Sequence, residues 1–315
     1  MWVAEMIQAG TQNRLAAFET LYDTSLGHEL PLPHELASIY GALRMPLREG
    51  RPHVIGNLVT SLDGVVSLGI PGKEGGKAIS GSNEHDRMLM GLLRATADAI
   101  IMGAGTLRTS PRHLLTPEYA YAPLAEAYAE FRSAQGKRGA PLSVIATASG
   151  EIGPGAALFA TGEPVLVVTT AAGAERLSEQ RLPAGVKVEV PEGEQARAEG
   201  NLTAGAMLRA VERTLEGGGS GRGNGVVLVE GGPHLIGNFF GDGCLDEMFL
   251  TLSPQVVGRD GATQRPGLVE GRSLAPEHPT WGRLVGVRRV ESHLFLRYLF
   301  DSNVVASNGS TSDAN

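Results

Sequence analysis

Short apolar runs alternate with amphipathic stretches through the middle of the chain. Such runs, bounded by glycine, proline and small polar residues, are typical of buried strands, and the stretches between them have the spacing of helices with one apolar face. The predicted strands are His53–Val59, Ala97–Met102, Leu142–Thr147, Pro164–Thr170, Val186–Val190, Gly225–Glu230, Glu247–Leu252, Arg283–Val290 and His293–Phe300. The predicted helices are Glu84–Arg94, Pro123–Ala134, Ala172–Gln180, Ala204–Glu216 and Leu235–Phe240. This order predicts an α/β fold with a mostly parallel sheet and helices on both faces.

The last two apolar runs differ from the others because only Glu291 and Ser292 separate them. So short a connection joins antiparallel strands, and we expect a C-terminal hairpin at the sheet edge. Residues 1–50, with a short apolar helix at Glu35–Leu43, are expected to form an N-terminal arm packed on a main domain of residues 51–300. Residues 301–315 are almost all small and polar, which predicts a disordered tail.

Two internal stretches interrupt this pattern. Gly217–Gly225 contains little besides glycine and predicts a flexible connector. The alanine-rich residues 119–139 are interpreted as an insertion of the kind that loops tolerate. Neither stretch is expected to carry chemistry.

Composition and charge narrow the classes of function. With 315 residues and 42% hydrophobic content the chain can bury a full core. It has no run of about 18 apolar residues to span a membrane, and Glu5 and Gln8 interrupt its start where a secretory signal would be apolar; we therefore expect a cytoplasmic protein. The 27 basic and 34 acidic residues leave a net charge of -7 with no long Lys/Arg run, which argues against nucleic acid as a partner. A phosphorylated small molecule is compatible with this balance.

Cysteine and histidine usage argues against a metal site. The single cysteine, Cys244, allows no internal disulfide and no cysteine-rich zinc site. The histidines form no His-Glu-x-x-His motif, and His85 and His234 are expected to be surface residues near helix starts. We therefore predict no metal.

Two glycine-rich turns follow predicted strands. Gly231-Gly232, with Pro233 behind them, end the strand Gly225–Glu230 and predict a tight turn into a helix whose backbone N–H groups point outward. Such a turn is suited to bind an anion. Gly103-Ala-Gly105-Thr106 repeats the arrangement after another apolar run. Either turn alone has plain turn chemistry as its alternative, and neither fits the Gly-x-Gly-x-x-Gly or P-loop motif, but together they suggest a nucleotide.

A third turn, Thr60-Ser-Leu-Asp-Gly64, ends the first strand of the main domain. In open parallel sheets ligands bind at the carboxyl ends of the strands, where all three turns fall. We therefore expect them to border one cleft. The alternative for Asp63 is a purely local role in which its carboxylate bonds neighbouring backbone.

The order of these blocks is more specific than any one of them. Ser-Leu-Asp-Gly after a strand is followed by Leu-Leu-Arg-Ala-Thr-Ala-Asp-Ala-Ile-Ile-Met-Gly-Ala-Gly-Thr, and then by Leu-Val-Glu-Gly-Gly-Pro-His-Leu and Leu-Ser-Pro-Gln-Val-Val-Gly. Over roughly residues 50 to 300 the chain resembles the reductase domain of the bifunctional riboflavin-biosynthesis deaminase/reductase, a family with the dihydrofolate reductase-like three-layer sandwich. The zinc motifs of the deaminase half, His-x-Glu and Pro-Cys-x-x-Cys, are absent, so we expect a stand-alone reductase.

The resemblance implies a reaction, a cofactor and an assembly. The expected reaction is NADPH-dependent reduction of 5-amino-6-(5-phosphoribosylamino)uracil or a related phosphoribosylamino-pyrimidine, by hydride transfer to the open-chain ribosyl imine. The protein would position the two reactants and stabilise the developing charge, because the cofactor supplies the hydride. By family analogy the enzyme is a homodimer.

The resemblance also implies site residues. Asp63 and Glu230 are the expected catalytic residues, and Ser61, Arg94, Leu114 and Glu230 are expected to bind substrate, with Arg94 on its phosphate. The residues expected to bind the cofactor are Thr60, Gly103, Gly105, Thr106, Ser110, Gly231, Gly232, Pro233, His234 and Leu235. Arg94 has the alternative role of complementing a helix dipole. The proton donor stays open among Asp63, Glu230 and a water molecule.

The chain departs from the family pattern near the substrate. Ser110 stands where an aspartate of the family's Asp-Asp-Pro is expected, and Gly76-Lys-Ala78 lies in the region of a missing Ser-x-Trp motif. Arg108 or Arg112 could replace the missing phosphate partner. The NADPH 2′-phosphate would be bound by residues after a neighbouring strand, with Thr169, Thr170 and Arg176 as candidates.

These departures leave two other functions open. One is a reductase of dihydrofolate or another pterin on the same fold, since the altered loop lies on the substrate side. The other is a regulatory protein that binds NADP without catalysis.

Overall fold

The computed structural model describes residues 15–46, 48, 50–73, 75–153, 155–191, 202–217 and 225–300. The expected tail at residues 301–315, most of the glycine-rich connector and the start of the N-terminal arm lie outside the described residues.

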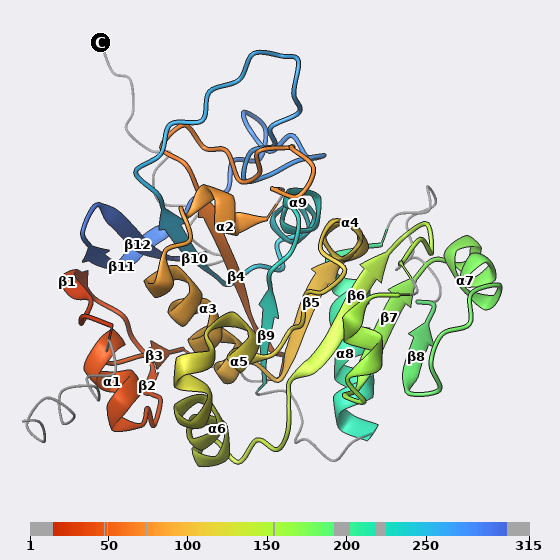
Figure 1. Cartoon of the computed structure of the whole chain (residues 1–315), viewed down its shortest axis with the longest axis horizontal. Coiled ribbons are helices and arrows are strands. Elements are labelled where there is room, and N and C mark those ends of the chain that lie inside the picture. Colours follow the sequence, from red (N-terminus) through yellow and green to blue (C-terminus); the bar gives the residue numbers. More distant parts are fainter. Residues whose placement is uncertain are drawn as a thin grey trace, which may run out of the picture.

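One ten-stranded sheet forms the centre of the molecule, in the order β1-β11-β12-β10-β4-β9-β5-β6-β7-β8 (Figure 1). Its strands are β1 (Glu19–Asp23), β4 (His53–Thr60), β5 (Ala99–Gly103), β6 (Leu142–Thr147), β7 (Val165–Thr169), β8 (Val186–Glu189), β9 (Val226–Val229), β10 (Glu247–Leu252), β11 (Arg283–Val290) and β12 (His293–Leu299). From β10 to β8 every neighbouring pair is parallel, whereas β12, β11 and β1 continue the sheet in antiparallel fashion. The mostly parallel sheet and the C-terminal hairpin are therefore confirmed.

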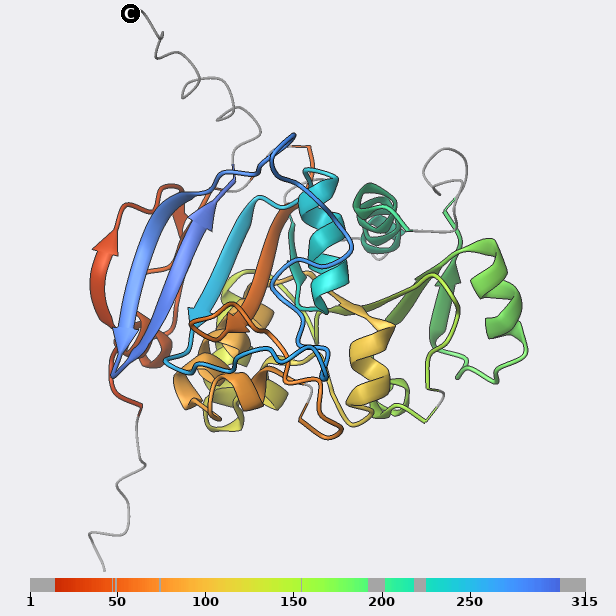
Figure 2. The same cartoon turned by 90° about the horizontal axis from the view of Figure 1, so that it is seen from above.

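Helices cover both faces of this sheet (Figure 2). They are α1 (His34–Tyr40), α2 (Gly76–Ile79), α3 (Glu84–Thr96), α4 (Ala104–Thr109), α5 (Pro117–Ala120), α6 (Ala125–Ala134), α7 (Ala171–Ser178), α8 (Ala204–Gly217) and α9 (Pro233–Gly241), with 3-10 turns at Ala122–Leu124 and Ala157–Ala160. A separate two-stranded sheet pairs β2 (His28–Glu29) with β3 (Arg44–Met45). The three layers are those expected.

The alternation of side chains along the strands divides the core into two parts. In β9, Val226 and Leu228 belong to the cluster under α1, α3 and α6, while Val227 and Val229 belong to the cluster under α8 and α9. Because both faces of the central strands are buried, these strands read as continuous apolar runs in the sequence.

The structure corrects two expectations: the position of the C-terminal hairpin in the sheet and the interpretation of residues 119–139 as an insertion. The edge strand is β1, which pairs with β11, so the hairpin lies one strand inside the edge. Residues 119–139 are not a peripheral insertion, because Tyr128 and Phe131 of α6 are almost completely buried in the core. A Cβ atom on Gly91 would lie 2.6 Å from the Tyr128 ring, so α3 and α6 are in close contact.

Candidate functional site

The three predicted turns lie together at one edge of the sheet. They follow β4, β9 and β5, which are adjacent and parallel, so their carboxyl ends point the same way. A Cβ atom on Gly231 would lie 2.8 Å from the backbone nitrogen of Gly103, and one on Gly232 would lie 3.6 Å from Oγ1 of Thr106. The turns after β9 and β5 therefore contact each other directly.

The turn after β9 has the geometry that its sequence predicts. Gly232 adopts a φ of 46° and is the N-cap of α9, and Pro233 occupies the first helical turn. The Leu235 and Ile236 N–H groups donate back to the Gly232 carbonyl. Within the part of the chain that the structure describes, the N–H groups of Gly232 and His234 have no acceptor. Together with the positive end of the helix dipole, they favour an anion at this point.

The turn after β4 is held by bonds within the protein. Ser61 is completely buried, and its Oγ donates to Oδ1 of Asp63 at 2.7 Å and accepts from the Val65 N–H at 2.9 Å. Asp63 also accepts from the backbone N–H groups of Val257 at 3.1 Å and Gly258 at 2.7 Å. These hydrogen bonds, that from Ser61 first, hold the pKa of Asp63 well below its usual range. Asp63 is therefore an ionised carboxylate that ties the loops after β4 and β10 together.

Glu230, the residue directly after β9, is paired with Arg94 of α3. Nε of Arg94 lies 2.9 Å from Oε1 and 3.0 Å from Oε2 of Glu230, and Nη2 lies 2.7 Å from Oε2. The Arg94 side chain is fully buried and that of Glu230 is 5% exposed. The pair is bidentate, which fixes the Glu230 carboxylate in one orientation beside the glycine turn.

The remaining donors of Arg94 are also used inside the protein. Nη1 donates to the carbonyls of Leu114 at 2.9 Å and Thr116 at 3.0 Å, and Nη2 contacts Nε2 of His113 at 2.9 Å. A guanidinium has five N–H groups, and all of them are committed here. In contrast to the expected role, Arg94 has no donor left for a substrate phosphate; it positions Glu230.

His113 completes this arrangement, although no sequence pattern points to it. Burial, with a smaller contribution from the Arg94 charge, lowers the pKa of His113 to about 3. The imidazole is therefore neutral, and its Nε2 accepts from Arg94. Its backbone N–H donates to the carbonyl of Ser110, which links Ser110 to the same loop. Ser110 thus contributes to loop geometry by its main chain.

Asn57 is a second residue that sequence reasoning missed. It lies on the central strand β4, on the same face as the buried Ile55 and Val59, yet it is partly exposed. The register of β4 and β9 pairs Gly56 with Val229, so the next positions, Asn57 and Glu230, are neighbours. A polar residue inside an apolar run was the available signal.

The residues considered for binding the NADPH 2′-phosphate and the substrate phosphate differ in their exposure and in their hydrogen bonds. Thr169 is fully buried, and Thr170 caps α7 by accepting from the Gly173 N–H at 3.0 Å. Arg176 is exposed and donates to the Ser149 carbonyl at 3.2 Å. Arg108 and Arg112 are both exposed.

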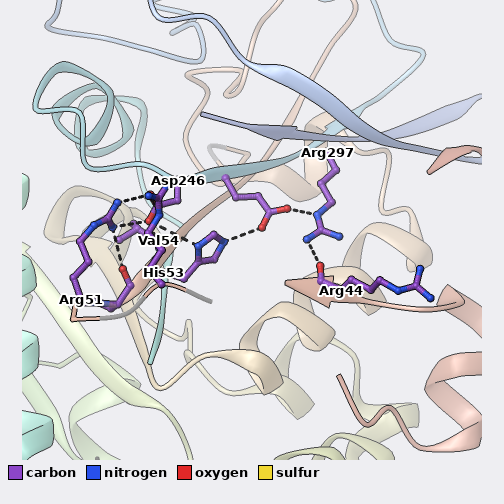
Figure 3. A network of polar contacts seen from close by, with 9 residues as sticks. Arg44, Arg51, His53, Val54, Asp246 and Arg297 are labelled. Atoms are coloured by element: carbon purple, nitrogen blue, oxygen red, sulfur yellow. Dashed lines mark hydrogen bonds and ion pairs between the residues drawn. The ribbon is translucent and has the colours of Figure 1, made fainter. Parts of the chain in front are cut away.

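A second charged network lies at the opposite end of β4 and β10 (Figure 3). His53, Asp246 and Glu247 are each at most 3% exposed. Nε2 of His53 lies 3.0 Å from Oε2 of Glu247, and Arg51 donates to both oxygens of Asp246 at 2.7 and 2.6 Å. Burial alone would raise the pKa of Glu247, but its ion pair with Arg297 lowers the pKa below its ordinary value.

In the described ranges, no three His, Cys, Asp or Glu side chains gather in a way that could hold a metal ion. No described helix is long and apolar enough to cross a membrane.

His85 is buried, not on the surface as expected, because its Nε2 contacts the Ala16 carbonyl and its ring packs on Phe18.

Comparison with known proteins assigns this arrangement to a family. The family model of the RibD C-terminal domain matches residues 52–291. The 2,5-diamino-6-ribosylamino-4(3H)-pyrimidinone 5′-phosphate reductase of Archaeoglobus fulgidus is 30% identical over 216 residues, which cover 68% of this chain and 85% of that protein.

Solved structures share the fold. A pyrimidine reductase-like protein from Corynebacterium diphtheriae superposes with a TM-score of 0.59 at 21% identity, covering 84% of this chain and 98% of that one. The deaminase/reductase from Thermotoga maritima gives a TM-score of 0.53 at 19% identity over 80% of this chain, which spans 57% of that protein's length. The chain belongs to the RibD C-terminal domain family, the pyrimidine reductases of riboflavin biosynthesis.

Proposed function

We propose that the protein is an NADPH-dependent reductase of a phosphoribosylamino-pyrimidine and that its active site is the carboxyl edge of β4, β9 and β5. The observation that carries this proposal is the Glu230 carboxylate, which the buried Arg94 fixes directly beside the glycine turn that begins α9. A fixed acceptor for substrate hydroxyl or ring N–H groups next to an anion-binding helix start is what hydride transfer between two phosphorylated molecules requires.

The residues at the turns fit a dinucleotide. Gly231 has no room for a Cβ atom against the backbone of Gly103 and Met102, and Gly232 needs its positive φ, so the cradle depends on both glycines. The pyrophosphate would lie on the free N–H groups of Gly232 and His234. When bound, a reduced nicotinamide nucleotide supplies the hydride.

The other contacts follow from the same placement. Pro233 and Leu235 shape the start of α9, and Thr60, Gly105, Thr106 and Ser110 would border the cofactor on the neighbouring turns. Arg176 is the cation that we assign to the 2′-phosphate, because Thr169 is buried and the Thr170 hydroxyl already bonds the backbone.

Glu230 would accept hydrogen bonds from the ribosyl hydroxyls or the pyrimidine ring. Leu114 is partly buried beside it, and its carbonyl is held by Arg94. For the substrate phosphate we propose Arg112, which is exposed, in place of Arg94. Ser61 and Asp63 shape the turn after β4 instead of acting on substrate atoms.

The proposal includes a homodimer in the cytoplasm, a reductase domain at residues 51–300 and an N-terminal arm at residues 1–50. Light scattering on the purified full chain measures the mass, and a monomer at all micromolar concentrations would remove the dimer from the proposal.

The decisive assay follows the loss of reduced-nicotinamide absorbance with NADPH and each candidate substrate. We expect turnover with 5-amino-6-(5-phosphoribosylamino)uracil or its 2,5-diamino-pyrimidinone counterpart and none with dihydrofolate. Turnover of dihydrofolate alone would make the protein a pterin reductase. NADPH binding without oxidation on any of these substrates would support a regulatory protein instead.

A further inference from the structure

The segment Val257–Arg272, which we call the strap, joins the loop after β4 to the helix α9. It is an irregular connection between β10 and β11. Figure 2 shows it passing the loop after β4 and then running beside α9. Leu268 and Val269 of the strap pack against the part of the core under α8 and α9. The strap is therefore held against the body of the protein between its two ends.

Hydrogen bonds hold the first end of the strap on the loop after β4. The Asp63 carboxylate accepts from the Val257 N–H at 3.1 Å and from the Gly258 N–H at 2.7 Å. The Asp63 carbonyl accepts from Nη1 of Arg259 at 3.1 Å. Nη1 of Arg265 donates to the carbonyls of Val257 and Gly258 at 2.9 and 2.7 Å. Asp63 thus anchors this end by both its side chain and its main chain.

The other end of the strap lies against the turn that begins α9. The Glu270 N–H donates to the Pro233 carbonyl at 3.2 Å. A Cβ atom on Gly271 would lie 2.9 Å from Nδ1 of His234. Pro233 and His234 directly follow Gly232, so the strap contacts the turn whose N–H groups favour an anion.

Further contacts continue along α9, one turn beyond its start. A Cβ atom on Gly237 would lie 2.5 Å from the Glu270 carbonyl oxygen, so the strap backbone approaches the helix closely. Nε of Arg272 donates to Oδ1 of Asn238 at 3.2 Å, and Nη2 contacts Oδ1 of Asp242 at 3.4 Å. The Arg272 side chain therefore fixes the second end of the strap on α9.

We propose that the strap sets the orientation of the turn that begins α9, with Glu270 and Arg272 as positioning residues and Asp63 as the anchor at the far end. Free N–H groups bind an anion well only when they are held pointing to one place. This inference rests on the proposed function, which identifies the anion as the pyrophosphate of NADPH. It gives Asp63 a part in cofactor binding that requires no contact with the cofactor.

The first test compares Arg272→Met with Arg213→Met, which removes an arginine–carboxylate pair between α8 and β8. Calorimetry on the full chain should show that Arg272→Met binds NADPH about tenfold more weakly. Its kcat should stay within about twofold, because positioning of the turn affects binding more than the reacting atoms. Arg213→Met should keep wild-type affinity. Wild-type affinity in folded Arg272→Met would make the residue merely structural and overturn the proposal.

A double-mutant cycle tests whether the two ends act through one strap. Asp63→Asn leaves one side-chain oxygen where the carboxylate has two, so it should release the Val257 or the Gly258 N–H and weaken NADPH binding about fivefold. If the ends are coupled, Asp63→Asn combined with Arg272→Met should lose clearly less affinity than the product of the two single losses. A loss equal to that product would overturn the coupling.

Hydrogen exchange without cofactor keeps the test independent of the proposed function. The peptide that contains the Glu270 amide should exchange about threefold faster in Asp63→Asn than in the wild type, because the anchor at the other end is weakened. A peptide from β6 is the internal control and should be unchanged. Unchanged exchange at Glu270 would overturn the proposal even if NADPH binds. Faster exchange in a protein that does not bind NADPH would support the strap and contradict the proposed cofactor.

Discussion

Buried charged residues lie at both ends of the strands β4 and β10, but the charges at the two ends differ in how they are bonded. At the amino end, Glu247 is bonded by Arg297 and His53, and Asp246 by Arg51 and the Val54 N–H. Toward the carboxyl end, Arg94 is fully bonded, and its partner Glu230 directly precedes the glycine turn and neighbours the partly exposed Asn57 of β4.

This difference distinguishes charged residues that join parts of the fold from charged residues that we propose to act in the active site. A buried ion pair by itself contributes little net stability, because desolvation offsets the attraction, although removing one partner is costly. The amino-end network joins segments far apart in the sequence, and its carboxylates are bonded by other groups of the protein. The carboxyl-end pair holds a fixed carboxylate next to the turn in which the Gly232 and His234 N–H groups have no acceptor among the described residues, and this arrangement supports the proposed active site.

The sharpest test of this comparison replaces the arginine at each end. Arg94→Met and Arg297→Met both leave a buried carboxylate without its cation, so each should lower the free energy of unfolding by about 3 to 5 kcal/mol. Only Arg94→Met should also reduce kcat of the folded enzyme, by about 100-fold. Denaturation curves and assays at a temperature where both variants are folded would check this, and equal loss of kcat in both would remove the distinction.

A smaller effect is expected at the glycine turn. Gly231→Ala would bring a Cβ atom to 2.8 Å from the Gly103 nitrogen, a backbone atom that cannot move without displacing β5. We expect a loss of about 1 to 3 kcal/mol in stability and about tenfold in NADPH affinity, measured by calorimetry. Gly185→Ala is the matched control, because nothing lies within 4 Å of its added Cβ atom. Wild-type affinity in Gly231→Ala would show that the turn does not hold the cofactor.

The smallest expected effect concerns acid stability at the carboxyl end. The pKa of His113 is about 3 in the folded protein and near 6.5 when unfolded, so the unfolded chain binds more protons between these values. Stability is therefore complete above pH 6.5 and falls as pH decreases toward 3. Relative to His113→Asn, the wild type should lose about 1 kcal/mol more between pH 7 and pH 5, about half the full linkage value because the ring is partly exposed. Parallel pH-stability curves for the two proteins would contradict this.

The sequence predicted the elements that bury apolar residues. Strands such as β6 and β10 are found at the expected positions, since runs flanked by turn residues leave few alternatives. The edge strand β1 was missed because all of its residues are exposed, so it has no apolar pattern. The six-residue α4 is too short to show helical periodicity.

Only the backbone conformation of the candidate site could be predicted from the sequence. Paired glycines before Pro233 specify a turn and helix start locally, whereas Arg94 and Glu230 are 136 residues apart and only the fold brings them together. Arg94 was therefore assigned to a phosphate.

The central claim is that hydride transfer to a phosphoribosylamino-pyrimidine takes place beside Glu230, and isotope transfer tests it most directly. The enzyme is mixed with substrate and NADPH carrying deuterium on the transferable position of nicotinamide C4, and the product is analysed by mass spectrometry and NMR. We expect one deuterium at C1′ of a ribityl product with the wild type, and about 100-fold slower labelling with Glu230→Gln. A product without deuterium at C1′, or equal labelling by the variant, would contradict the account.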